Sequence, residues 1–198
     1  MDKPAETQHP IHDLLARRWS PRAFSDRPVA PDVLRRLWEA ARWAPSSANL
    51  QPWSIIVATR DDAQEFDGML GCLVDGNQIW ARQAPVLMIT VAAKLDRDGD
   101  VNAHAWHDVG QAVAGLSVQA TALGLFVHQM AGILPDRIRE RYQIPDSHEP
   151  VTGIALGYPG APDQLPEKLR QRELAPRTRK PIGEFVFSNR WGQASKLV

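Results

Sequence analysis

Residues 44–53 read Ala44-Pro45-Ser46-Ser47-Ala48-Asn49-Leu50-Gln51-Pro52-Trp53. Prolines restrict the backbone at both ends of this stretch. Between them, the hydroxyls of Ser46 and Ser47 and the amides of Asn49 and Gln51 can hold a flat polar heterocycle, while Trp53 covers apolar surface. An amphipathic helical pattern precedes the stretch, and an apolar strand pattern at residues 55–58 follows it. The sequence therefore predicts a ligand-binding loop between a helix and a strand.

The rest of the chain has the hydrophobic patterns of a protein that mixes helices and strands. Pro31 and Pro135 suit the first turn of a helix, and Pro45 disfavours helix at Ala44. The patterns predict helices at residues 11–18, 31–44, 62–72, 102–123 and 135–142, and strands at residues 54–58, 85–93, 126–128, 151–158 and 184–187. Strict alternation of strand and helix is missing, which favours an α+β sandwich over a doubly wound fold.

The length of 198 residues suits one domain. We expect this domain to span residues 1–198, with a flexible arm at residues 1–10, which are polar and punctuated by prolines. Residues 159–198 are expected to form an extended C-terminal segment, since residues 159–180 are rich in proline and arginine and look like a surface tail.

The predicted helix at residues 102–123 has unusually small side chains. It carries six alanines and two glycines, Gly110 and Gly115. Small side chains let neighbouring helices approach closely. Two interpretations stay open: the helix forms the core of a homodimer, or it is buried within its own chain.

Charge is balanced overall but clustered locally. The chain has 23 basic and 23 acidic residues, so no global field favours nucleic acid or an anionic membrane. Basic residues gather near both ends of the chain: Arg17, Arg18 and Arg22, and then Arg170, Arg172, Arg177, Arg179 and Lys180. These two clusters either converge on a single anion or form two solvated basic segments.

Cysteine usage and the absence of targeting patterns favour a cytoplasmic protein. Cys72 is the one cysteine, so an intrachain disulfide is excluded, which fits a reducing compartment. Its role stays open between a nucleophile and a small packing residue. The sequence has no signal-peptide pattern and no apolar run that approaches a membrane span.

Several common chemistries have no motif in this chain. No G-x-G-x-x-G, G-x-x-x-x-G-K-[ST] or G-x-S-x-G motif occurs. His104 and His107, with Asp108 beside them, are spaced for one helix face, but a catalytic metal would have to recruit a third ligand such as His128 or His148. We therefore expect no metal site, and we expect these histidines on a helix surface or beside a substrate.

Five segments, taken in order, resemble the FMN-dependent nitroreductase family. They are Arg18-Trp19-Ser20-Pro21-Arg22-Ala23-Phe24, the stretch at residues 44–53, Gly76-Asn77-Gln78-Ile79-Trp80-Ala81 ahead of Ala84-Pro85, Val127-His128-Gln129-Met130-Ala131-Gly132, and Arg177-Thr178-Arg179-Lys180-Pro181. The resemblance covers nearly the whole chain. It implies an α/β sandwich with a central mixed or antiparallel sheet flanked by helices, assembled as an intertwined homodimer with FMN at the subunit interface.

The resemblance also implies roles for residues near both ends of the chain. Arg18 and Ser20, together with Arg177 and Arg179, would contact the FMN phosphate. Arg22 would lie toward the pyrimidine edge of the flavin and stabilise the negative charge that appears there on reduction. Trp19 replaces an arginine of the family, and its indole either packs on apolar surface or caps the site.

The remaining flavin contacts implied by the resemblance come from two other segments. Pro45, Ser46, Ser47, Asn49 and Gln51 would approach the flavin from the partner subunit. Gln129, Ala131 and Gly132 would run along the ring, with a backbone N–H near Ala131 or Gly132 donating to flavin N5. Two departures stand out: Ala81 and Ala84 offer none of the polar flavin contacts found in some members, and Ala131 replaces an acidic residue.

The implied activity is a ping-pong transfer of hydride from NAD(P)H through flavin N5 to nitroaromatics, quinones or related small electrophiles. No protein side chain need act as a nucleophile. Asn77, Trp80, His104 and His107 are candidates to line the substrate pocket; for Trp80 the alternative is core packing, and for the histidines it is an exposed helix face. Two other functions remain open: another flavoenzyme reaction on the same fold, such as reductive dehalogenation or flavin breakdown, and a non-catalytic FMN-binding sensor or carrier.

Overall fold

The computed structural model describes residues 3–198. Its centre is a four-stranded sheet in the order β1-β2-β4-β3, formed by β1 (Trp53–Thr59), β2 (Val86–Ala93), β4 (His148–Gly157) and β3 (Phe126–Met130). Every neighbouring pair is antiparallel, from Trp53 opposite Ala92 to Phe126 opposite Gly157. The predicted α+β fold with a central sheet is confirmed, and the sheet is antiparallel throughout.

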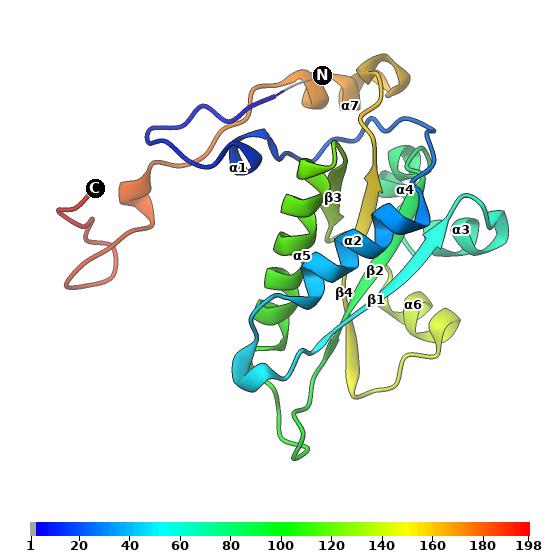
Figure 1. Cartoon of the computed structure of the whole chain (residues 1–198), viewed down its shortest axis with the longest axis horizontal. Helices are drawn as coiled ribbons and strands as arrows, with labels where there is room; N and C mark the ends of the chain where they lie inside the picture. Colours follow the sequence, from blue (N-terminus) through cyan, green and yellow to red (C-terminus); the bar gives the residue numbers. More distant parts are fainter. Residues whose placement is uncertain (1–2) are drawn as a thin grey trace.

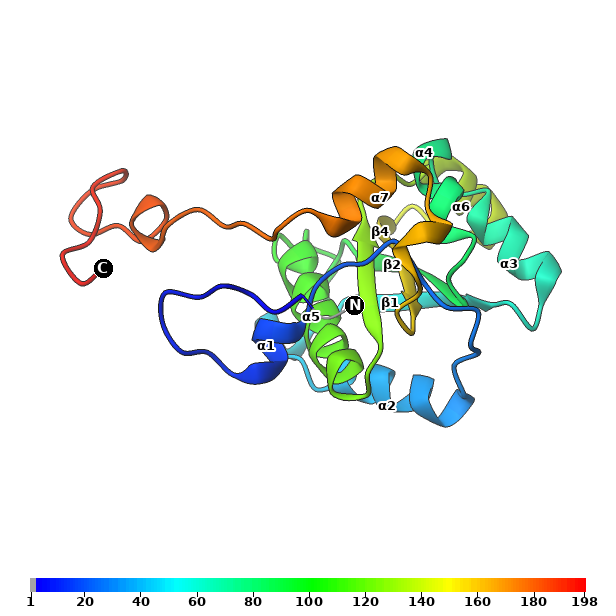
Figure 2. The same ribbon diagram turned by 90° about the horizontal axis from the view of Figure 1, so that it is seen from above.

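Helices cover both faces of this sheet (Figure 1, Figure 2). The long helix α5 (Ala105–Ala122) and α2 (Pro31–Arg42) pack on one face, with Val86 and Met88 of β2 below them. The helices α3 (Ala63–Leu70), α4 (Asp75–Ala81) and α6 (Pro135–Tyr142) cover the other face, where Leu87 and Ile89 point. Successive side chains of a strand face opposite sides, so the continuous apolar run of β2 supplies both cores.

The small residues of α5 allow close packing within the chain. A side chain on Gly115 would place its Cβ 3.0 Å from the carbonyl oxygen of Ala40 in α2, so glycine permits the two helices to touch. Val109, Val113 and Leu116 bury the inner face of α5 under α2 and the sheet. Of the two predicted alternatives for this helix, burial within its own chain would produce such packing.

Three parts of the chain differ from the sequence-based expectations. Residues 159–180 contain η2 (Pro162–Gln164) and the helix α7 (Glu167–Leu174) rather than only extended chain; α7 is polar, so it lacks the periodicity by which helices were assigned. The helix α4 had not been predicted. The predicted strand at residues 184–187 is wrong: Ile182–Glu184 forms the short 3-10 helix η3, and Phe187 makes an isolated bridge with Ala194 instead of pairing with the sheet.

The two ends of the chain behave differently. Residues 1 and 2 of the predicted flexible arm lie outside the described residues, and the rest of the arm is tied to the body where the backbone N–H of Ala5 donates to the carbonyl of Ala16 in α1 (Asp13–Arg17). From Pro176 onward, the C-terminal segment runs away from the sheet and its helices (Figure 2). Among residues 3–198, no helix combines the length and apolarity that a membrane crossing needs.

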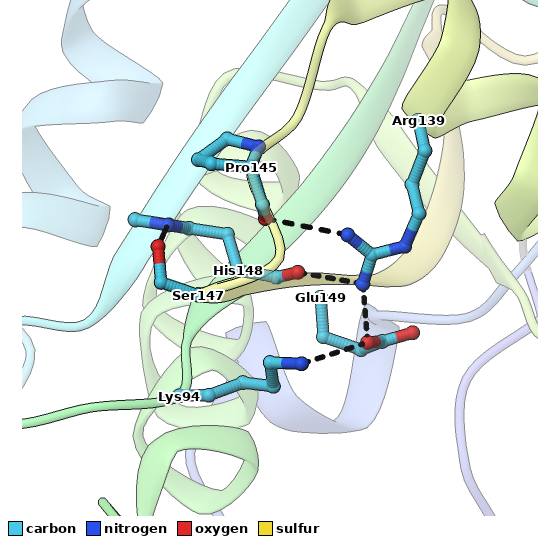
Figure 3. A network of polar contacts seen from close by, with 6 residues as sticks. All are labelled: Lys94, Arg139, Pro145, Ser147, His148 and Glu149. Carbon is cyan, nitrogen blue, oxygen red and sulfur yellow. Dashed lines mark hydrogen bonds and ion pairs between the residues drawn. The ribbon is translucent and has the colours of Figure 1, made fainter. Parts of the chain in front are cut away.

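A polar network fastens α6 to the start of β4 (Figure 3). The guanidinium of Arg139 donates to the carbonyls of Pro145 and His148 and pairs with the carboxylate of Glu149. Lys94, just after β2, lies 3.8 Å from the same carboxylate. The network joins residues of three segments at one end of the sheet. Its contacts have a structural role, since they hold these segments together.

Candidate functional site

Three arginines from opposite ends of the chain converge on one cavity. Arg18 follows α1 directly, and Arg177 and Arg179 follow α7. All three line a cavity of about 900 Å³, together with residues 5–9 of the N-terminal arm and residues 180–182. Part of each basic cluster therefore converges, whereas Arg17 and Arg170 pair with Asp13 and Glu167 at exposed positions.

The electrostatics of this arginine cluster favour an anion. Burial, and then the charges of Arg177 and Arg179, lower the pKa of the Arg18 guanidinium from its usual value. Within the described part of the chain, none of the three has a carboxylate within 4.0 Å. Glu6 lines the same cavity but pairs with none of them. Guanidinium groups bind phosphate through paired N–H donors, so a cluster without an ion-pair partner suits a phosphate group.

The three arginines are held in different ways. The Nη1 of Arg177 donates to the carbonyls of Lys3 and Ala16, at 2.7 and 2.8 Å, and so ties the N-terminal arm to α1. The Nη1 of Arg18 lies 3.3 Å from the hydroxyl oxygen of Ser20. Arg179 is exposed and donates only to the neighbouring carbonyl of Thr178. Arg18 and Arg179 are therefore the freer ligands for an anion, and Arg177 also has a structural role.

The segment after Arg18 packs against β3. Trp19 is 5% exposed and its ring meets Phe126 edge to face, with centroids 6.1 Å apart. Of the two alternatives for this indole, the structure therefore supports packing on apolar surface. The next anchor is His128, whose Nδ1 lies 2.8 Å from the carbonyl oxygen of Pro21. Because a carbonyl only accepts, Nδ1 carries the proton, and burial lowers the pKa of His128 to about 4, which keeps the ring neutral.

Arg22 has an anchored backbone and an unpaired side chain. Its N–H and that of Ala23 donate to the buried carboxylate of Glu173 in α7. Its guanidinium lies 6.0 Å from the ring centroid of Trp80 and, among the described residues, makes no hydrogen bond or ion pair. A half-buried guanidinium without a protein partner is available to a ligand.

Trp80 belongs to the core. Its side chain is 1% exposed, and its ring packs between Phe24, at 6.4 Å between centroids, and His128, at 4.4 Å. Of the two alternatives for this residue, the structure supports core packing rather than a place in a substrate pocket. Ala81 and Ala84 are buried beside it and bring no polar group to a ligand.

Residues 45–51 form a strained loop that is held to α5. Ala48, Asn49 and Gln51 have φ angles of 48°, 53° and 50°, in the left-handed region that non-glycine residues seldom enter. The N–H of Ser47 donates to Asp108 Oδ2 at 3.0 Å, and the N–H of Gln51 donates to the Ser46 hydroxyl at 3.0 Å. Pro45, Ser47, Asn49 and Gln51 are exposed, so the loop presents polar groups outward.

The loop and the arginine cluster do not meet within one chain. Figure 1 shows the loop beside the N-terminal end of α5, while α1 lies near the other end of that helix. No residue of the loop lines the cavity of the arginine cluster.

The segment at residues 129–132 leaves β3 and offers backbone donors. The carbonyl of Gly132 accepts from the N–H of Val74 and from the side chain of Asn77, at 3.1 and 3.0 Å. A Cβ on Gly132 would come within 2.6 Å of the Asn77 amide nitrogen and 2.7 Å of a Val74 methyl, so a larger residue there would force these side chains to move. In the described part of the chain, no group accepts from the N–H of Ala131 or Gly132. Gln129 and Ala131 are exposed.

His104 and His107 are exposed at the N-terminal end of α5. In the single chain both lie on an exposed helix face, and a place beside the substrate stays a prediction. Among residues 3–198, no three His, Cys, Asp or Glu side chains are grouped to hold a metal ion. Cys72 is buried, its Sγ lies 3.4 Å from the carbonyl of Gly68, and burial raises the pKa of its thiol.

Sequence analysis missed the roles of two buried carboxylates, Asp108 and Glu173. Each is 1% exposed, and each holds the backbone of a distant segment. Asp108 had been noticed only as a neighbour of His107. Their partners lie 61 and 151 residues away along the chain, so no local pattern could have linked them.

Comparisons with known proteins point to one family. The model described as "Nitroreductase family" matches residues 15–71 and 70–158. A solved structure of an oxidoreductase containing FMN is 35% identical and has a TM-score of 0.89, with 94% of this chain and 95% of that chain covered. A Streptomyces coelicolor protein named as an NADH dehydrogenase or NAD(P)H nitroreductase is 26% identical, over 77% of this chain and 86% of its own.

A Bacillus subtilis protein named FMN reductase (NAD(P)H) is 27% identical to this chain. The alignment covers 77% of this chain and 67% of that protein. The family match includes Arg18, the loop at residues 45–51 and Gly132, but it ends before Arg177 and Arg179. The convergence of those two arginines on Arg18 is therefore an observation of the structure itself.

Proposed function

This chain belongs to the nitroreductase family of flavin-dependent NAD(P)H oxidoreductases, and we propose that it binds FMN and reduces small electrophiles such as nitroaromatics and quinones. The observation that carries the proposal is the arginine cluster of Arg18, Arg177 and Arg179, which has no carboxylate partner among the described residues. The named activities of the relatives support the redox chemistry.

The residues present fit FMN. The arginine cluster and the hydroxyl of Ser20 would hold its phosphate. The N–H groups of Ala131 and Gly132, which have no acceptor among the described residues, would donate to the ring. A residue larger than glycine at position 132 would have to displace Asn77 and Val74. The unpaired guanidinium of Arg22 would stabilise negative charge on the pyrimidine edge. Gln129 is exposed at the same end of β3.

The chemistry that bound FMN supplies is hydride transfer, from NAD(P)H to flavin N5 and then, in a second half-reaction, to the acceptor. The contribution of this chain is binding and electrostatics. Arg18 and Arg179 anchor the phosphate, so that the ring is oriented toward the backbone donors. Arg22 supplies a fixed positive charge, and a neutral His128 holds the carbonyl that precedes it.

We also propose that the complete site needs two copies of this chain. The polar loop at residues 45–51 and the arginine cluster lie near different ends of α5 and share no cavity. Pro45, Ser46, Ser47, Asn49 and Gln51 would therefore reach the flavin held by the arginine cluster of a partner subunit.

The test is an anaerobic visible spectrum of the purified protein, before and after NADPH and then NADH. We expect flavin bands that bleach with at least one nucleotide and return when a nitroaromatic or a quinone is added. The variant Arg18→Ala/Arg179→Ala should lose bound FMN, because each charge-assisted contact contributes about 1.5–3 kcal/mol.

The matched control is Arg17→Ala/Arg172→Ala, which removes the same charge from the same two segments but leaves the cavity lining intact. This control should stay as yellow as the wild type. A wild-type protein that is colourless even after incubation with FMN would refute the proposed function. Bands that persist with both nucleotides would instead indicate a flavin-binding protein without this reductase activity.

A further inference from the structure

The buried carboxylate of Glu173 accepts hydrogen bonds from backbone N–H groups. It is 1% exposed, and no cation lies within 4.0 Å of it among the described residues. The N–H of Arg22 donates to both of its oxygens, at 2.9 and 3.0 Å, and the N–H of Ala23 donates to Oε1 at 3.0 Å. Burying a charge is costly unless hydrogen bonds replace its hydration, and these charge-assisted bonds do so.

The backbone around Arg22 is anchored from other sides as well. His128 of β3 donates to the carbonyl of Pro21, and the N–H of Gly160 donates to the carbonyl of Ala23 at 2.9 Å. The N–H of Ser25 donates to the carbonyl of Tyr158 at 2.9 Å. Residues 21–25 are therefore fixed against β3, α7 and the chain after β4, and the side chain of Arg22 is the part left without a polar partner.

The helix that carries Glu173 is itself secured at its C-terminal end. Lys3 Nζ donates to the carbonyls of Glu173 and Ala175, both at 2.6 Å. The last carbonyls of a helix have no partner within the helix, so this lysine satisfies that of Glu173 and also that of Ala175, the residue after the helix. The described start of the N-terminal arm thus supports the position of the Glu173 carboxylate.

We propose that Glu173 is the positioning residue for Arg22, and this inference rests on the proposed flavin function. A carboxylate paired directly with the guanidinium would neutralise it. Here the carboxylate bonds to the backbone N–H of the same residue, so the segment is fixed while the positive charge remains available to the flavin. Glu173 acts through Arg22 and has no contact with substrate.

The test compares Glu173→Gln with Glu167→Gln, the same substitution at an exposed position of the same helix. A glutamine oxygen in the place of Oε1 still accepts from both N–H groups, but the negative charge that strengthens these bonds is lost and an NH₂ group faces the N–H of Arg22 in the place of Oε2. In the FMN-free protein, we expect amide hydrogen exchange at residues 22–23 to become at least about tenfold faster in Glu173→Gln, which corresponds to about 1.4 kcal/mol of lost protection. Glu167→Gln should match the wild type.

A second readout is the midpoint potential of bound FMN, measured for the wild type, Arg22→Ala, Glu173→Gln and the double variant. Arg22→Ala should lower the potential, because the negative charge of the reduced flavin loses its cation. Glu173→Gln removes a negative charge, which by itself raises the potential, and displaces Arg22, which lowers it. In the Arg22→Ala background only the rise remains, so Glu173→Gln should shift the potential further upward there than in the wild type. Additive shifts, or unchanged amide exchange in Glu173→Gln, would overturn the proposal.

The failure of the proposed function has a separate signature. If Arg22→Ala leaves both the affinity for FMN and its potential unchanged, the role assigned to Arg22 is wrong, and the positioning role of Glu173 falls while flavin binding stands. If the wild type binds no FMN, the proposed function itself is wrong.

A second variant covers the case in which Glu173→Gln does not fold. Lys3→Ala removes two hydrogen bonds at the end of α7 and should change amide exchange at residues 22–23 and the flavin potential, each by a smaller amount. Unchanged exchange and potential in Lys3→Ala would then overturn the proposal.

Discussion

His128 shows how a single side chain can be set to one protonation state by its place in the fold. Its ring packs on Trp80 at 4.4 Å, and its Nδ1 donates to the carbonyl of Pro21. Burial lowers its pKa to about 4; the hydrogen bond to Pro21 opposes this shift, and the charge of Arg22 adds to it. A neutral imidazole beside Arg22 avoids a second cation in the proposed flavin site.

We therefore expect the protein to lose stability between neutral and mildly acidic pH. In the unfolded chain His128 titrates near 6.5, so between about pH 6.5 and 4 the unfolded state binds more protons than the folded state. The free energy of unfolding should fall by up to about 3 kcal/mol over this range as the pH is lowered. Urea unfolding at pH 7 and pH 5, at one protein concentration, measures the difference.

His128→Asn retains a donor near the position of Nδ1 and does not titrate, so part of this pH dependence should disappear. His107→Asn is the control, since His107 is exposed. Equal pH dependence in the wild type and in His128→Asn would contradict the assignment.

At the scale of elements, the connection between α2 and β1 is held in a strained form by a contact from α5. Three non-glycine residues of the loop have positive φ angles, and each such residue costs about 1–2 kcal/mol. Such a strained conformation is stable only if contacts with the surrounding structure offset its cost. Asp108, in the first turn of α5, provides one anchor through the N–H of Ser47.

We expect Asp108→Ala to release this anchor and to lower the free energy of unfolding by about 1.5–3 kcal/mol, the usual contribution of a hydrogen bond to a charged group. Amide exchange at residues 46–51 should become faster. Asp108→Asn is the matched variant, because its side-chain oxygen can still accept from Ser47, and its effect should be smaller. An Asp108→Ala protein with wild-type stability and loop exchange would show that the anchor is unimportant.

At the scale of the whole molecule, the C-terminal segment leaves large apolar side chains uncovered. Figure 2 shows the segment extending away from the body, and Phe185 and Trp191 on it are 52% and 92% exposed. Exposed aromatic residues concentrated on one segment are typical of a surface that another molecule covers. The proposed homodimer accounts for this exposure.

If the segment packs on a partner subunit, Phe185→Ser/Trp191→Ser should weaken the dimer. Burying one such side chain contributes about 1.5–3 kcal/mol, so the dimer dissociation constant should rise by at least about tenfold. Sedimentation over a range of protein concentrations measures it. Leu174→Ser removes an exposed apolar side chain from α7 and should leave the constant unchanged. A wild-type chain that sediments as a monomer would contradict the homodimer.

Local sequence signals are sufficient to locate several elements of this fold. The period of 3.6 and the prolines located α2 and α6 within a few residues, and the continuous apolar run located β2. The loop at residues 45–51, the segment after Arg18 and the C-terminal arginines were all identifiable from residue types at short spacing. These patterns can be recognised without the tertiary structure, because each depends only on residues that are close together along the chain.

Which of these segments meet depends on how the chain folds in three dimensions. Folding brought Arg177 and Arg179 to Arg18, placed Trp80 in the core, and linked Glu173 to Arg22 and Asp108 to Ser47. The polar helix α7 was missed for a related reason, since its place depends on one buried carboxylate and on Lys3 rather than on an apolar stripe. Such contacts join residues far apart in the chain, and their free energy comes from burial and hydrogen bonding that exist only once the sheet and its helices have assembled.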